Sequence, residues 1–232
     1  MPILLFAALV MAAGWFAVRR LPRPDGTAVG APSGSALEAI RLALGPGLLR
    51  GPMLLAAATG VFHGGSFLVL LPLLIREGHG GGSVWLGAAH ACFMLGTLAG
   101  IALLQLLPAA LRPGRVLLAS VGLGSLALAL LPTAAPTAYL LPLVVGWGLC
   151  GGIGMVMSRS IVQQAAPASH RGRVLGVYSL ASFGGLPLGS LLLGQLAGWL
   201  GTGASAQGSA ALVLLVTATV ALTTPLIRAR ST

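Results

Sequence analysis

The sequence predicts an all-α integral membrane protein with about seven transmembrane helices. Of its 232 residues, 56% are hydrophobic and only 7% are charged, whereas soluble domains carry roughly 25% charged residues. A helix needs about 20 apolar residues to cross a hydrocarbon core of ~30 Å, and the apolar runs here are continuous, which favours helices over a β-barrel. The predicted spans are residues 3–18, 54–75, 84–107, 116–132, 138–158, 174–199 and 210–227.

The arginines predict the orientation of this bundle. All 13 basic residues are arginine, and counting alternate loops leaves Arg76 alone on one side of the membrane. The positive-inside bias then places the N-terminus outside and the C-terminus in the cytoplasm, in a multi-pass inner-membrane protein. A net charge of +10 is also compatible with nucleic-acid binding, but aromatics make up only 5% and long apolar runs separate the charges, so nucleic acid is excluded as a partner. The arginines on the predicted cytoplasmic side are Arg19, Arg20, Arg23, Arg41, Arg50, Arg112, Arg115, Arg159, Arg171, Arg173, Arg228 and Arg230.

The first apolar run is predicted to be a transmembrane helix and not a signal peptide, because its positive charges follow the run instead of preceding it. A helix that starts outside without an export signal suggests that the chain has lost its beginning. The sequence therefore divides into a helix at residues 1–18, a cytoplasmic linker at 19–50 and a six-helix bundle at 51–232. The part of the linker at 21–34 is rich in Pro, Gly and Ala and is predicted to be flexible.

A short amphipathic helix is predicted near the end of the linker. Ser35 and Glu38 have the spacing of a capping box, and Gly45-Pro46-Gly47 is a stop signal. We expect this helix to lie at the membrane interface, since its apolar residues share one face; an unstructured linker with chance spacing is the alternative. The residues of that face are Leu37, Ile40 and Leu44, with Arg41 off the stripe.

Two segments of the bundle recur at nearly constant spacing. His63-Gly64-Gly65 matches Cys150-Gly151-Gly152 at an offset of about 87 residues, and the glycines of the third predicted span match those of the sixth at about 89. The matched spans run in opposite directions, which is the form of an inverted three-helix repeat. The second match pairs Leu86-Gly87, Gly96, Gly100 and Leu103-Leu104 with Leu175-Gly176, Gly185, Gly189 and Leu192-Leu193.

The segment from Ser158 to Gly201 resembles the major facilitator superfamily. Its Arg171-Gly172-Arg173-Val174 turn, its Gly184–Gly189 run and its Gly194-x-x-x-Gly198 ending are similar to helices ten and eleven of the branch with siderophore exporters and macrolide efflux proteins. The resemblance implies helices six to twelve, namely a C-terminal six-helix bundle of two inverted repeats plus one preceding helix. It also implies efflux of a small solute by alternating access across the lipid bilayer.

This mapping leaves about five helices of the family pattern unmatched. A missing N-terminal half, encoded separately, or a homodimer partner would have to supply the opposing wall of the transport path. The basic loop expected between helices eight and nine is degraded here, because Leu111–Arg115 lacks the usual Asp. The alternative to a transporter is a truncated, non-transporting membrane scaffold or gene remnant.

Polar residues inside the spans are candidates for a solute or proton pathway, because ionisable groups at that depth normally face a cavity or a partner helix. His63 lies near the middle of its span, and an imidazole could bind solute or relay a proton; a neutral packing histidine is the alternative reading. His90, Ser66 and Gln105 are the other candidates.

The arginines near the cytoplasmic face are candidates for gate residues. They are Arg112, Arg115, Arg159, Arg171 and Arg173, and membrane anchoring is the alternative role. Close glycines predict tight helix packing, and Gly184 and Gly185 before Pro187 predict a bend. The packing and hinge set is completed by Gly96, Gly100 and Gly189.

The sequence predicts neither an enzyme nor a bound cofactor or metal. Asp25, Glu38 and Glu77 are the only acids and lie in predicted loops or at a helix end, so positioned acid–base chemistry is not available. Gly146-x-Gly148-x-x-Gly151 follows no strand and is rejected as a dinucleotide motif. Cys92 and Cys150 show no metal or redox spacing and are interpreted as small buried thiols, with a disulfide as the alternative.

Overall fold

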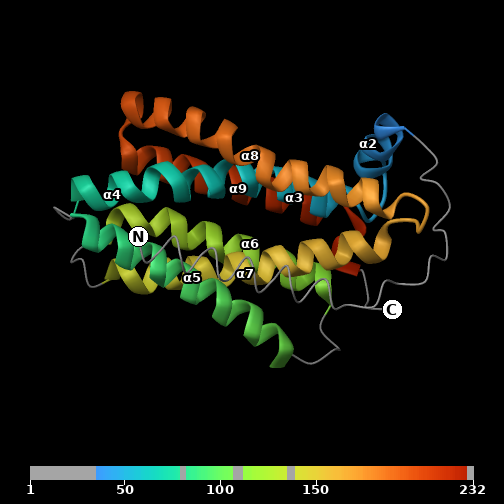
Figure 1. Cartoon of the computed structure of the whole chain (residues 1–232), viewed down its shortest axis with the longest axis horizontal. Helices are drawn as coiled ribbons and strands as arrows, with labels where there is room; N and C mark the ends of the chain where they lie inside the picture. The colour runs from blue at the N-terminus through green and yellow to red at the C-terminus, as the bar shows by residue number, and fades with distance from the viewer. Residues whose placement is uncertain (1–34, 79–81, 107–111, 135–138, 229–232) are drawn as a thin grey trace, which may run out of the picture. The chain divides into compact units, whose positions relative to one another are not determined.

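The computed structural model describes residues 35–78, 82–106, 112–134 and 139–228, and this part of the chain contains helices and no strands (Figure 1). Six of its helices are long and apolar enough to cross a membrane, which confirms the predicted fold class and the second to seventh predicted spans. The predicted span at 3–18 and the linker up to residue 34 lie outside the described residues. The six spans are Arg50–Glu77, Ser83–Leu106, Pro113–Thr133, Leu140–Ala165, Arg171–Leu200 and Thr202–Thr223.

The elements follow one another with short connections. In chain order they are α2 (Ala36–Leu44), α3 (Arg50–Ala58), the π-helical segments η1 (Thr59–Gly64) and η2 (Ser66–Leu70), α4 (Leu71–Gly78), α5 (Ser83–Leu106), α6 (Pro113–Leu130), the 3-10 turn η3 (Leu131–Thr133), α7 (Leu140–Ala165), α8 (Arg171–Leu200), α9 (Thr202–Thr223) and the 3-10 turn η5 (Pro225–Arg228).

The first described span is not a regular α-helix. It runs from α3 through η1 and η2 to α4, and the two π-helical segments form its middle. A change from α to π hydrogen bonding disturbs the regular pairing of main-chain carbonyls. The hydroxyl of Thr59, the first residue of η1, donates to the carbonyls of Leu55 at 2.7 Å and Ala56 at 3.3 Å. These carbonyls therefore keep a partner in a membrane interior that supplies no water.

Helices α5 and α7 touch main chain to main chain. Gly96 and Gly100 of α5 face the main chain of α7, and Gly148 and Gly152 of α7 face the main chain of α5. A Cβ atom on any of these four glycines would overlap a carbonyl oxygen of the other helix. The small residues thus allow the close approach that stabilises helix pairs in lipid.

The same contact recurs between α8 and the first described span. Gly185 and Gly189 of α8 face the main chain at Val61, while Gly60 and Gly65 face the main chain of α8. A Cβ atom on Gly65 would lie 2.6 Å from the carbonyl carbon of Gly189. Gly185 and Gly189 are the predicted repeat partners of Gly96 and Gly100 of α5. The matched glycines therefore make the same kind of main-chain contact in both halves of the bundle. In the same way, α6 packs on α7 and α9 packs on the first span.

The short helix α2 confirms the predicted capped helix. The Ser35 side chain accepts a hydrogen bond from the Glu38 main-chain N–H at 3.1 Å, and the helix ends at Leu44 before Gly45. Its alanine face, Ala39 and Ala43, is fully buried, and α2 packs on α8 and α3. The predicted apolar stripe lies on the opposite, exposed side and comprises Leu37, Ile40 and Leu44.

The last span begins earlier than its hydropathy indicates. Helix α9 starts at Thr202 and ends at Thr223, not at residues 210 and 227 as predicted. Gly201, with φ 84°, ends α8 and lets α9 follow directly. The hydroxyls of Ser205 and Ser209 donate to the carbonyls four residues before them at 2.8 Å. The polar side chains at the start of α9 thus find their hydrogen-bond partners within the helix itself.

The surface of the spans is apolar. Many large aliphatic side chains are left uncovered by the chain itself, as expected for a surface that faces lipid and not water. Examples with more than 60% exposure are Leu95, Leu98, Leu188, Leu191, Leu215 and Leu222.

Candidate functional site

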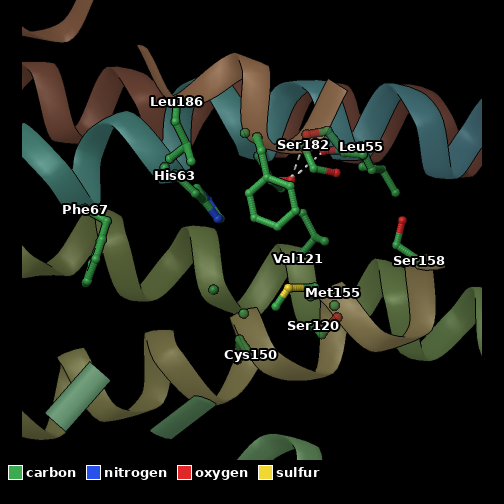
Figure 2. Close-up of a pocket in the computed structure, with 18 of the residues that line it drawn as sticks. Leu55, His63, Phe67, Ser120, Val121, Cys150, Met155, Ser158, Ser182 and Leu186 are labelled. Carbon is green, nitrogen blue, oxygen red and sulfur yellow. Dashed lines mark hydrogen bonds between the residues drawn. The ribbon is translucent and has the colours of Figure 1, made fainter. Parts of the chain in front are cut away.

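A cavity of about 450 Å³ lies inside the described bundle (Figure 2). Residues from α3, η1, η2, α5, α6, α7 and α8 line it, so both repeats contribute to its wall. Its volume falls within the range of roughly 300–1,000 Å³ that is usual for small-molecule sites. Most of the wall is apolar, with polar groups at a few defined positions.

One end of the cavity is a cluster of aromatic rings. The ring centroids of Phe67 and Phe93 are 4.4 Å apart, and those of Phe93 and Trp147 are 5.1 Å apart. The imidazole of His63 stands nearly perpendicular to Trp147, with an interplanar angle of 85° and a centroid distance of 5.9 Å. Such edge-to-face geometry is favourable for aromatic rings and gives the cavity a rigid apolar end.

The hydrogen bonds of His63 define which of its nitrogens carries the proton. Nε2 lies 3.0 Å from the hydroxyl oxygen of Ser125, and that hydroxyl donates its one hydrogen to the Val121 carbonyl at 2.8 Å. Ser125 can therefore only accept from His63, so Nε2 carries the hydrogen. In the neutral imidazole, Nδ1 then keeps a lone pair. Figure 2 shows the His63 ring pointing into the cavity.

The opposite end of the cavity is polar and lies toward the C-terminus of α7. Arg159 and Ser158 of α7 line it, together with Tyr178 and Ser182 of α8. The hydroxyl oxygen of Ser182 is buried and has no hydrogen-bond partner among the described residues. Ser158 is buried and donates a long hydrogen bond of 3.5 Å to the Pro52 carbonyl. This end therefore offers hydroxyl groups and one guanidinium to a bound molecule.

The structure brings only some of the predicted pathway residues to the cavity. His63 lines it, whereas His90, Ser66 and Gln105 do not. His90 lies behind the aromatic cluster, where its ring contacts Phe67 at 4.8 Å and its Nδ1 bonds to the carbonyl of the residue one turn earlier. Ser66 is fully buried in the first span, and its hydroxyl has no partner among the described residues. Gln105 is exposed near the end of α5.

Of the predicted gate arginines, likewise, only some lie at the cavity. Arg159 lines the cavity, while Arg112 and Arg115 lie at the start of α6 and Arg171 and Arg173 lie in the first turn of α8. The predicted hinge at Gly184, Gly185 and Pro187 lies inside α8, which continues as a helix through the proline.

Several lining residues were not predicted from the sequence. Trp147, Tyr178, Ser120 and Ser182 were missed because single hydroxyl and ring side chains in an apolar run carry no spacing signal. For Cys150 a signal was present: the internal repeat aligns it with His63, and both side chains line the cavity.

The chain matches the sequence model of the Major Facilitator Superfamily over residues 1–190. The chain belongs to the Major Facilitator Superfamily. This agrees with the six described spans and with the repeated packing of the glycine contacts. Searches of curated proteins and of solved structures found no match.

Membership of this family assigns the chain to membrane transporters of the major facilitator type and not to enzymes, as the sequence predicted. A multi-pass membrane location, a lipid bilayer around the spans and a transported solute follow from it. The narrower resemblance of this major facilitator to siderophore and macrolide exporters stays a prediction.

Proposed function

We propose that this chain moves a small, largely apolar solute outward across the inner membrane by alternating access, and that the cavity is its part of the transport path. The observation that supports this most directly is a mostly apolar cavity between helices of both repeats, with His63 in its wall. Sites at the interface of inverted repeats are the usual place for solute binding in secondary transporters. A second copy of the chain, or an N-terminal half, completes the wall.

His63 is the proposed contact for the solute or for a transported proton. Its Nδ1 lone pair can accept a hydrogen bond, while Ser125 holds the ring in place through Nε2. The predicted orientation, with the N-terminus outside, puts the arginine-bearing end of the cavity toward the cytoplasm. In this proposal Arg112, Arg115, Arg171 and Arg173 set the topology and contact the cytoplasmic gate.

A native cysteine allows a test that does not require the solute to be known. In a Cys92→Ser background, Cys150 is the single thiol and lies in the cavity wall. Alternating access predicts that a membrane-impermeant thiosulfonate modifies Cys150 from both sides, in right-side-out and in inside-out vesicles. A Gly172→Cys variant with both native cysteines replaced by serine serves as the reference, and we expect it to react from the cytoplasmic side only. Modification of Cys150 from one side alone, with the reference behaving as expected, would refute alternating access.

A further inference from the structure

The cavity wall carries one permanent charge and no opposing charge among the described residues. Arg159 is the one arginine that lines it, and neither Glu38 nor Glu77 does. The described part of the chain contains a single ion pair, between Glu38 and His170 at 3.7 Å, and Arg159 is not part of it. Charged groups within membrane proteins normally pair with an opposite charge or face a functional cavity. Arg159 therefore lacks a carboxylate partner within the described residues.

The two described acids are engaged away from the cavity. Glu38 lies on α2 beside His170, and Glu77 accepts a hydrogen bond from the Thr202 hydroxyl at 2.7 Å at the far end of the first span. Ser158, the residue before Arg159, is hydrogen-bonded to the Pro52 carbonyl. Arg159 therefore lies at the level of the beginning of that same span. The length of the span separates this level from Glu77 by roughly 35 Å. Neither carboxylate forms an ion pair with Arg159.

Arg159 lies near the C-terminal end of α7, where it lines the cavity and its side chain is exposed. Every Cα–Cβ bond in an α-helix tilts toward the N-terminus, and the N-terminal part of α7 carries Trp147 and Cys150. The Cα–Cβ bond of Arg159 therefore tilts toward the aromatic end of the cavity. The guanidinium offers a planar set of N–H donors that matches carboxylate and other oxyanions.

The cavity consequently has two chemically different ends. Trp147, Phe67 and Phe93 form the aromatic end, and Arg159 lies twelve residues beyond Trp147 on α7, about 18 Å along the helix axis. The wall between them is largely apolar, and the Ser120 side chain is one of its polar groups (Figure 2).

We infer that the cavity binds an elongated organic anion, with a ring system against the aromatic end and a carboxylate or similar oxyanion on Arg159. The inference rests on the proposed function, because it names the class of solute for the same site. Arg159 is then the residue that selects solutes by charge. Since no described carboxylate lines the wall, a cationic solute of the same shape would meet an unfavourable field.

Protection of Cys150 from alkylation tests this inference without measuring transport. The protein carries Cys92→Ser and is reconstituted in phosphatidylcholine nanodiscs, and the rate of its reaction with N-ethylmaleimide is followed. Three probes of similar shape are compared: 2-naphthoate, 2-naphthamide and 2-naphthylmethylammonium. We expect 2-naphthoate to protect at concentrations about tenfold or more below those of the amide, because charge-assisted hydrogen bonds are the stronger kind. The ammonium probe should protect least.

Variants at two arginines complete the experiment. Arg159→Gln should abolish the advantage of 2-naphthoate over 2-naphthamide and leave protection by the amide unchanged, which also shows that the variant is folded. Arg159→Lys should keep part of the advantage. Arg76→Gln, at an exposed arginine outside both the cavity and the proposed gate, should change nothing.

Three outcomes would overturn the inference. The three probes could protect Cys150 equally, or 2-naphthoate could keep its advantage over 2-naphthamide in Arg159→Gln. In the third outcome, phosphatidylglycerol added to the nanodisc protects Cys150 as well as 2-naphthoate does. The last would show that a lipid headgroup, and not a ring-bearing solute, is the anion bound. One-sided labelling of Cys150 with intact protection by 2-naphthoate would refute transport and leave the binding specificity standing.

Discussion

Two glycines on α7 should respond in opposite ways to the same substitution. Gly148 faces the main chain of α5, where an added Cβ would lie 2.9 Å from the Phe93 carbonyl carbon and closer still to its oxygen. Gly146, two positions earlier on the same helix, has nothing within 4 Å of an added Cβ. Gly148→Ala therefore tests the close contact of the helices, and Gly146→Ala is its matched control.

The size of the effect follows from the contact distance. Moving the Phe93 carbonyl carbon from 2.9 to an ordinary 3.4 Å already requires the two main chains to separate by roughly 0.5 Å, and the closer oxygen requires a larger separation. Closely packed helices cannot separate in this way without losing neighbouring contacts. Overpacking of this kind costs about 1–3 kcal/mol. In Gly146→Ala no contact is lost, and the higher helix propensity of alanine contributes up to about 1 kcal/mol of stability.

Reversible unfolding in mixed micelles measures both variants. The fraction of helix is followed by circular dichroism as the mole fraction of sodium dodecyl sulfate rises, and the free energy of unfolding is compared with that of the unmodified chain. We expect Gly148→Ala to be less stable and Gly146→Ala to be equal or more stable. Equal destabilisation of both would mean that alanine disturbs α7 everywhere, and the argument from the glycine contact would fail.

Three further changes give defined outcomes. Gly151→Phe puts a ring into the cavity, because a Cβ there meets only the Phe93 side chain at 3.8 Å, and it should slow alkylation of Cys150 several-fold; an unchanged rate would place the ring elsewhere. Thr202→Val removes the 2.7 Å hydrogen bond to the exposed Glu77 carboxylate and should lower the free energy of unfolding by about 1 kcal/mol. Gly201→Ala should cost about 1–2 kcal/mol in the same unfolding assay, because its φ of 84° is unfavourable for residues with a Cβ atom.

The positions of the spans could be predicted because lipid imposes a simple rule on composition. Long apolar stretches must become helices of a minimum length, and four of the six described spans lie close to their predicted limits. Helix α7 continues to Ala165, seven residues beyond its predicted end at 158. The limit at Thr202 was misplaced because hydropathy scores a hydroxyl as polar even where the helix's own carbonyls accept its hydrogen. The capping of α2 was predictable because the Ser35 contact is local.

The composition of the cavity wall was harder to predict, because depth in the membrane does not give the direction in which a side chain points. Ser66 follows His63 by three residues, which in a regular α-helix places both on one face. The intervening turns are π-helical, and in this geometry Phe67 joins His63 in the wall while Ser66 is buried away from it. No residue pattern in the sequence marks these wider turns.

The wider turns also bear on how the chain tolerates changes in length. A π-helical turn holds about one residue more than an α-helical turn, so loss of one residue between Thr59 and Leu70 could be absorbed as a return to regular geometry. Such a deletion would leave everything beyond it close to its present orientation, whereas the same deletion from a regular α-helix would rotate it by about 100°. The carboxylate of Glu77 would then stay beside Thr202. Among homologous chains, single-residue deletions in this segment should therefore leave both of these positions unchanged.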